Sequence, residues 1–445
     1  MRQTLHLWPE LLRWLKELQD TRFLPYIEYE KEFLVWSALM VFLCELRSRR
    51  MIDYDLRELE GWMLANLNEL AGTKQTSLPV NKTVSHALGH IGPEQIVELQ
   101  NKMVGKLLRN KVMESCRLYN GMMRVAVDAT GMVSFRQRHC PRCLERKTSA
   151  GSIFQHHVLE AKLVSPSGLA ISLCHEFIEN PDGITEQDYG KIKQDCELKA
   201  FARLAAKLKA TYPRLPICLL GDALYCCGTV IDTCQRNGWG LICTFKEGRT
   251  PSLWREFNAL LDVCPENTLT VQQPDGTGQR YRWINSLPHF DRDQHEHNVN
   301  AVLLEETRDG TPHTFAYLTN IQVKETTASA LAHTGGRSRW KIENQGFNYQ
   351  KNSGLNLKHP YSHDERILKC FYTLLQIAHM MLQLFFAGSP LMHLAARYGK
   401  TPLQLFGSLA KICQRLLECL RYYRIPRDAF DQHAARSIQL RLNTS

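Results

Sequence analysis

The chain has 445 residues, of which 44% are hydrophobic and 22% charged. This is the composition of an ordinary soluble globular protein, and it excludes a disordered chain or a membrane bundle. A chain of this length can bury one large core and accessory domains, so we expect roughly two to four structural units.

The formal net charge is +10, and it is concentrated at one end of the chain. Residues 331–445 contain 16 Lys and Arg but 6 Asp and Glu, whereas the first 330 residues contain 39 of each. A basic end on an otherwise neutral chain suggests a polyanionic partner. A solvated basic helical surface explains the same composition equally well.

Nothing in the sequence predicts secretion or a membrane span. The first residues contain no apolar core followed by a small-residue cleavage site. The apolar run at residues 33–44 is too short to span a bilayer, and polar residues interrupt the run at 370–388, so both predict buried helices. The fifteen cysteines are scattered along the chain, which favours reduced thiols. We therefore expect a cytoplasmic protein without membrane contact.

Residues 1–120 predict a helical N-terminal domain, because apolar residues recur there at helical spacing. Polar residues from Asn81 begin one short helix, and Gly92 and Pro93 begin a second. Two short helices joined by a turn would suit a DNA-binding domain, although many helical bundles share this pattern.

Residues 121–248 predict a mixed α/β sheet, the first part of a core domain. Two of its β-branched or apolar runs, at residues 124–128 and 217–222, are short strands that end in Asp128 and Asp222. The other predicted elements are strands at 158–164, 169–178 and 240–245, and helices at 195–211 and 229–237.

Residues 249–322 predict a β-rich insertion. Two pairs of strands flank the turns at Asp275-Gly276 and Asp309-Gly310, and Asp-Gly is a turn sequence that hairpins favour. Residues 323–388 return to helix and complete the core. Residues 389–445 predict a basic helical C-terminal region, where Arg421, Arg424 and Arg427 could contact phosphates.

Asp128 and Asp222 are the first candidate site residues, because ligands gather at the C-terminal ends of parallel strands. If the two strands are neighbours, the two carboxylates converge, and a cation must offset their repulsion. Oxygen ligands suit Mg²⁺ or Mn²⁺, and a third acid would complete a two-metal site for phosphoryl transfer. A single Asp at a strand end is more often a turn or cap residue.

The third acid is Glu343, in a basic and aromatic segment at residues 336–351. Arg339 and Glu343 are four residues apart and therefore lie on one helix face, which Phe347 continues. A surface Arg–Glu pair is the plain alternative. This segment, however, follows the β-rich insertion and opens the basic end of the chain.

The segments at residues 125–131, 219–225 and 339–351, with a β insertion before the last, resemble the DDE transposases of bacterial insertion sequences. The likeness is greatest to the insertion-sequence-four type, whose core is RNase H-like, and it covers roughly residues 120–385. It implies that Asp128, Asp222 and Glu343 are the catalytic, metal-binding triad. It also implies that Arg339 is the arginine of that group's Tyr-Arg-Glu-Lys signature.

Two positions depart from the signature, because Gly336 replaces the tyrosine and Gln350 replaces the lysine, with Lys351 one residue later. We expect Arg339, Lys341 and Lys351 to contact DNA. The resemblance implies cleavage of transposon ends, strand transfer into target double-stranded DNA, two Mg²⁺ or Mn²⁺ ions, a homodimer and a bacterial cytoplasm. The alternatives are an inactive, transposase-derived DNA-binding protein and an RNase H-like nuclease without strand transfer.

A second metal site is conceivable around Cys140 and Cys143, which form a Cys-x-x-Cys sequence. His139 precedes it and His156-His157 follow, and Cys174 or His175 could also contribute to a structural zinc site. Adjacent histidines match the usual zinc spacing poorly, so reduced structural cysteines are the favoured interpretation.

Other acidic and histidine residues are weaker candidates for a metal or catalytic site. The sequence His295-Glu296-His297 predicts a solvated loop. Asp195 and Glu197 predict the start of a helix, where negative charge opposes the helix dipole. Glu176 and Glu179, on a predicted strand, are fallback metal ligands.

Overall fold

The computed structural model describes residues 2–57, 61–181, 183, 188–189, 191, 193–273, 276–291, 294–308 and 310–426. The chain divides into two compact units. A helical unit consists of Met1–Met113 and Phe347–Ser445, and a sheet unit consists of Glu114–Gly346. The boundary between Gly346 and Phe347 falls inside the segment predicted to complete the core. Arg427 and the predicted turn residues Asp275 and Asp309 lie outside the described residues.

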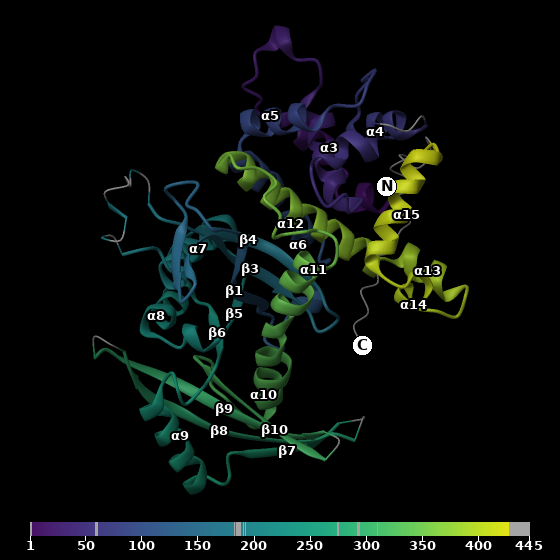
Figure 1. Ribbon diagram of the computed structural model, residues 1–445. Helices are drawn as coiled ribbons and strands as arrows, with labels where there is room; N and C mark the ends of the chain where they lie inside the picture. Colours follow the sequence, from purple (N-terminus) through teal and green to yellow (C-terminus); the bar gives the residue numbers. More distant parts are fainter. Residues whose placement is uncertain are drawn as a thin grey trace. The chain divides into compact units, whose positions relative to one another are not determined.

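The helical unit is built on two long apolar helices, α3 (Lys31–Leu43) and α12 (Glu365–Ala387). Every residue of α3 except the first is buried, because the helix is apolar on all sides. It packs against α12, α4 and α5, and α12 also packs against α6 (Figure 1). The other helices of this unit are α1 (Arg2–Leu7), α2 (Leu11–Glu17), η1 (Leu24–Tyr26), η2 (Ile52–Leu56), α4 (Met63–Ala71), α5 (Asn81–Ile91), α6 (Pro93–Arg109), α11 (Tyr349–Asn352), α13 (Ser389–Ala396), α14 (Pro402–Phe406) and α15 (Leu409–Tyr422).

The segment Glu365–Ala396 is long and apolar enough to cross a membrane by length and composition. However, 78% of its most apolar window is buried inside the protein. Burial of that extent is typical of the core helix of a soluble protein. The predicted interruption by Gln376 and His379 fits this assignment, because both side chains are buried and bonded to Gln350.

The sheet unit contains a ten-stranded mixed sheet, with the order β2-β3-β1-β5-β6-β10-β9-β8-β7 and β4 beside β3 (Figure 1). Neighbours β1, β5 and β6 are parallel, and the other pairs are antiparallel. The strands are β1 (Met123–Phe135), β2 (Leu144–Thr148), β3 (Gly151–Val164), β4 (Ala170–Ile178), β5 (Ile217–Gly221), β6 (Gly240–Thr244), β7 (Thr268–Gln272), β8 (Gly278–Phe290), β9 (Glu296–Arg308) and β10 (Thr311–Thr319).

Helices lie between the strands of the sheet unit in chain order. Strand β5 is buried throughout, as its continuous apolar sequence predicts for a central parallel strand. Helix α7 packs its stripe of Phe201, Leu204 and Leu208 toward β3 and β4. The helical segments of this unit are η3 (Glu114–Cys116), α7 (Glu197–Thr211), η5 (Ala223–Tyr225), α8 (Gly228–Asn237), α9 (Pro251–Val263), α10 (Glu325–Ser329), η6 (Ala330–Gly335) and η7 (Gly336–Arg339), followed by η8 (Ile342–Asn348), which crosses into the helical unit. The predicted fold class, a mixed α/β sheet core with helical regions at both ends of the chain, is confirmed.

Several predicted elements differ from the structure. The strand predicted to end at Asp128 continues to Phe135, because its antiparallel pairing with β3 extends to that residue. Within the β-rich segment the structure adds α9, whose buried Leu253, Phe257 and Leu261 recur every four residues after Pro251. That spacing is a helical signal in the sequence. Strand β10 also pairs with β6, so the β-rich segment extends the core sheet.

The predicted solvated loop at residues 295–297 is also wrong in part. Glu296 and His297 begin β9, where His297 lies opposite His289 on β8. His297 is buried, and its Nε2 atom lies 3.2 Å from Oδ2 of Asp291. Its Nδ1 atom lies 3.4 Å from Oδ1 of Asp232. The strand pairing with β8 and the contact with the distant Asp232 explain why local polarity misassigned the segment.

Strand β3 contains a fully buried ion pair, in which Nζ of Lys162 lies 3.4 Å from Oε2 of Glu160. Ser172 donates a hydrogen bond of 2.7 Å to the same oxygen. We expect Lys162→Met to lower the free energy of unfolding by about 3–5 kcal/mol, because it leaves the Glu160 carboxylate buried without this cation. Lys147→Met, at an exposed position on β2, is the matched control. Equal urea midpoints for the two variants would contradict this prediction.

Candidate active site

Asp128 and Asp222 lie next to each other in the register of two parallel strands. The last paired residues of β1 and β5 are Ala126 and Leu220, and each Asp follows two residues later. Local backbone bonds fix both side chains. Oδ1 of Asp128 accepts from the amide of Ala129 at 2.9 Å, and Oδ1 of Asp222 accepts from the amide of Leu224 at 2.8 Å, where it caps η5.

Arg339 connects Asp128 with Glu343, residues that are more than 200 positions apart in the chain. Its Nη1 atom donates to Oε1 of Glu343 at 2.6 Å and lies 3.7 Å from Oδ2 of Asp128. The predicted Arg339–Glu343 pair is thus present, at the point where η7 gives way to η8. Arg339 is buried, and its Nε atom has no hydrogen-bond partner among the described residues. The guanidinium has an unused donor beside the carboxylates.

Burial raises the pKa of Asp128 to about 7. The nearby guanidinium of Arg339 opposes this shift, while the negative charges of Glu343 and Glu197 add to it. Since desolvation and two acids outweigh one arginine, the cluster lacks positive charge. A divalent cation would supply that charge.

Glu197 is a fourth acid of this cluster that the sequence analysis assigned only to a helix start. It is the first residue of α7, and its Oε1 atom accepts a hydrogen bond of 2.8 Å from the Tyr225 hydroxyl. Burial raises the pKa of Glu197, Tyr225 lowers it, and the charge of Asp222 raises it again. No spacing in the sequence indicates this position, because α7 meets η5 only in the folded sheet.

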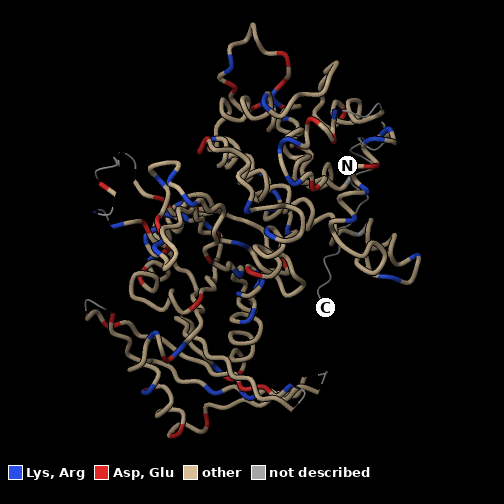
Figure 2. Tube along the Cα trace, in the orientation of Figure 1, with Lys and Arg blue, Asp and Glu red and all other residues tan. Residues whose placement is uncertain are grey.

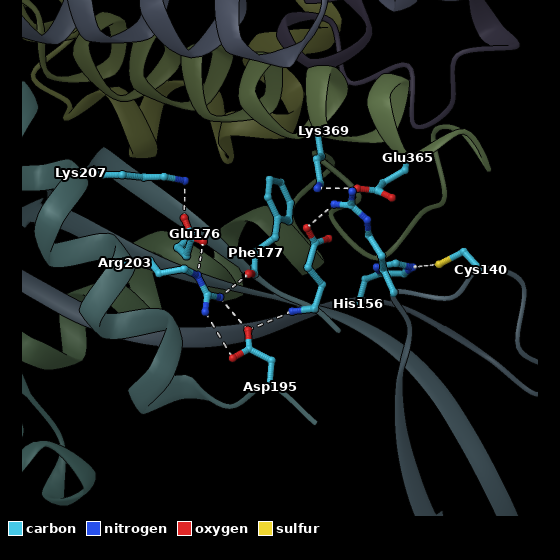
Figure 3. Close-up of polar contacts among 11 residues, drawn as sticks. Cys140, His156, Glu176, Phe177, Asp195, Arg203, Lys207, Glu365 and Lys369 are labelled. Atoms are coloured by element: carbon cyan, nitrogen blue, oxygen red, sulfur yellow. Dashed lines mark hydrogen bonds and ion pairs between the residues drawn. The ribbon is translucent and has the colours of Figure 1, made fainter. Parts of the chain in front are cut away.

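Glu176 and Glu179, the fallback metal ligands, form ion pairs with arginine and lysine side chains. Arg203 pairs with Glu176 at 2.6 Å and with Asp195 at 2.6 Å, and Lys207 also pairs with Glu176 (Figure 3). Arg142 pairs with Glu179 at 2.8 Å. These largely buried carboxylates form a network in which each negative charge is already matched. They are therefore poorer candidates for metal ligands than the Asp128 cluster.

The predicted DNA-binding residues lie in different surroundings. Lys341 lines an open cleft of about 490 Å³ in the sheet unit, together with Arg337 and Trp340, which is 55% exposed. Lys351 belongs to the helical unit, on α11, with its Nζ atom 5.9 Å from the ring centre of Phe347. Acidic and basic residues alternate along much of the chain (Figure 2), so charge alone does not mark a binding face.

The two departures from the transposase signature have structural reasons. Gly336 lies against the ring of Tyr317, which a Cβ atom at position 336 would overlap. A tyrosine there would require Tyr317 to move. Gln350 is fully buried and donates to Oε1 of Gln376 at 2.8 Å, and it lies 3.0 Å from Nδ1 of His379. A lysine at that position would place a charge in the core of the helical unit.

Cys140 and Cys143 lie together with His139 and His156, and the ligand atoms of all four residues are within 4.8 Å of one another. All fifteen cysteines have free thiols. The sequence had grouped the two cysteines with His139, His156, His157, Cys174 or His175 as possible ligands. Of these, the structure brings His139 and His156 to the pair, and His156 reaches it from β3.

The chain was compared with protein-family models and with curated proteins. No protein-family model matches the chain. No curated protein matches it at a significant level.

Proposed function

We propose that this protein is a DDE-type DNA transposase, with Asp128, Asp222 and Glu343 as its catalytic carboxylates. One observation carries the proposal: a buried guanidinium joins Asp128 of β1 to Glu343 of η8, while Asp222 follows the neighbouring strand in matching register. Such an arrangement gathers three acids from three distant segments. Carboxylates gathered where the parallel pairing of two strands stops are suited to metal-dependent phosphoryl transfer.

The donor set fits Mg²⁺ or Mn²⁺. All three side chains offer carboxylate oxygens, which these hard cations prefer. Oδ2 of Asp222 and Oε2 of Glu343 accept no hydrogen bond from the described residues, so both oxygens are available as ligands. When bound, two such ions would stabilise the attacking and leaving oxygens of a phosphodiester.

The remaining groups have roles that follow from their positions. Backbone amides at Ala129 and Leu224 orient the two aspartates, so each presents its other oxygen. Arg339 donates to Glu343 and lies beside Asp128, so it positions these two carboxylates relative to each other. Lys341 and Trp340 offer a cation and an aromatic face to the DNA strand.

The proposed partners are the double-stranded DNA of transposon ends and target, with a homodimer pairing the two ends. The proposed location is the bacterial cytoplasm, with no membrane contact. An inactive DNA-binding protein and a nuclease without strand transfer are the competing functions, and the intact carboxylate cluster favours a catalyst over the first of them.

The test is a reaction with DNA that carries the flanking ends of the protein's own gene, in the presence of Mg²⁺. A transposase gives both cleaved ends and strand-transfer products. Cleavage without joined products would identify the nuclease. Binding of the ends by folded protein without cleavage would identify the inactive DNA-binding protein.

We expect Arg339→Ala to lower the cleavage rate by about 10- to 100-fold, since a hydrogen bond to a charged group contributes about 1.5–3 kcal/mol. Arg339→Lys should restore part of the rate, because it keeps the charge but loses the planar donors. Arg255→Ala, at an exposed position on α9, is the matched control. Equal rates for Arg339→Ala and the control would contradict a role for this arginine.

A further inference from the structure

A cluster of sulfur and nitrogen ligands lies outside the carboxylate site, where the loop between β1 and β2 meets β3. Nε2 of His156 lies 3.4 Å from Sγ of Cys140 (Figure 3). It also lies 3.3 Å from Sγ of Cys143. The two sulfur atoms are 3.3 Å apart, and Nδ1 of His139 lies 3.2 Å from Sγ of Cys143. Two thiols and two imidazoles therefore face one point.

These separations are close to those of a tetrahedral zinc site. With Zn–S bonds of about 2.3 Å and Zn–N bonds of about 2.0–2.1 Å, tetrahedral geometry places two sulfurs about 3.8 Å apart and a sulfur about 3.5 Å from a nitrogen. The observed distances are a few tenths of an ångström shorter. A small outward movement of the side chains would admit the ion.

The loop that presents the cysteines is fixed from outside the cluster. The carbonyl of Cys143 accepts hydrogen bonds from Nη1 of Arg138 at 2.9 Å and from Nδ2 of Asn180 at 2.8 Å. The amide of Asn180 donates to the carbonyl of Arg142 at 3.1 Å. Hydrogen bonds of this kind hold ligand-bearing segments in place around metals. The ligands are thus preorganised by residues that do not bind the ion.

A disulfide explains the cluster less well. The distance of 3.3 Å between the sulfurs is far from the bond length of about 2.05 Å. A disulfide would also use only the two thiols, whereas zinc uses all four groups. Each thiol would lose its proton to solvent as the ion binds.

We propose that His139, Cys140, Cys143 and His156 bind one structural Zn²⁺ ion. Four protein ligands leave no open coordination position, which is typical of structural zinc and not of catalytic zinc. The ion would connect the loop after β1 to β3, the partner strand of the one that bears Asp128. This inference is independent of the proposed transposase activity, and neither result decides the other.

The test measures the zinc content of the full-length chain after dialysis against a metal-free buffer. We expect about one zinc per chain in the wild type, and less than ~0.2 in His156→Ala and Cys143→Ser. His157→Ala, at the neighbouring position on β3, and Cys196→Ser, at an exposed cysteine, are matched controls that should retain the zinc. Loss of zinc from the controls as well would overturn the assignment.

A second measurement, made on the wild type alone, tests the proposal even if the variants fail to fold. The metal-free wild type is titrated with Co²⁺, and two thiolate ligands in a tetrahedral site should give intense visible and near-ultraviolet absorption that saturates at about one equivalent. Absence of this absorption from folded protein, or a Cys140–Cys143 disulfide found by peptide mass mapping, would overturn the proposal.

Discussion

Asp222→Asn should lower the rate of Mg²⁺-dependent DNA cleavage by at least ~10³-fold while DNA binding largely survives. A metal ligand contributes several kcal/mol of transition-state stabilisation, and each 1.4 kcal/mol corresponds to a factor of ten. The amide keeps the shape of the side chain and can still accept from the Leu224 amide that caps η5. Fold and binding surface should therefore persist, and the chemistry alone should be lost.

The matched control is Asp262→Asn, which removes a carboxylate from an exposed position on α9. It should cleave as fast as the wild type. Cleavage is measured as a single-turnover rate with excess protein, and binding by the mobility of the same DNA in Ca²⁺. A rate for Asp222→Asn within tenfold of the control would remove Asp222 from the catalytic residues.

Asp128→Asn should make the metal-free protein more stable than the wild type at pH 8, although it abolishes cleavage. The pKa of Asp128 is about 7 in the folded protein, against about 3.9 in an unfolded chain. Below about pH 4 both states hold the proton, and the carboxyl contributes nothing to the pH dependence. As the pH rises from about 4 to 7, the folded state loses stability relative to the unfolded state, and above 7 the loss is complete.

Asparagine cannot ionise, so the variant escapes this loss. We expect its Tm to exceed that of the wild type by about 2–4 °C at pH 8 in EDTA, the shift that ~1 kcal/mol produces in a unit of this size. The difference in Tm between Asp128→Asn and the wild type should vanish near pH 4. Asp262→Asn should follow the wild type at every pH. A lower Tm for Asp128→Asn at pH 8 would contradict the view that burial outweighs Arg339 at this carboxyl.

The centre of the sheet unit could be predicted because its parallel strands β5 and β6 are short, apolar and closed by turn residues. The parallel strands β5 and β6 and helices α7 and α8 were expected within two residues of their actual bounds. The length of β1 was not, because Gly131 and a register shift interrupt its second half, which continues as a strand through pairing with β3. Similarly, His297 at the start of β9 is buried and contacts Asp232 on α8, 65 residues earlier in the chain. Such long-range partners leave no trace in local sequence.

The candidate site, like the fold, could be predicted only in part from the sequence. The four-residue spacing of Arg339 and Glu343 indicated their ion pair in advance, whereas Asp128 was chosen as a strand end and lies within β1. Glu197 was missed as a member, because its proximity to Asp222 depends on how α7 returns to the sheet. His139 and His156 complete the cysteine pair for a comparable reason: β3 brings His156 back beside the loop that bears Cys143.

The central claim is that Asp128, Asp222 and Glu343 form one divalent cation site, and Mn²⁺ binding measured by electron paramagnetic resonance tests it most directly. The wild type should bind Mn²⁺ at pH 8. Asp128→Asn, Asp222→Asn and Glu343→Gln should each weaken binding by at least ~10-fold, or ~1.4 kcal/mol, while Asp262→Asn should not. If the three amide variants bind Mn²⁺ as tightly as the wild type, these residues do not share a metal site.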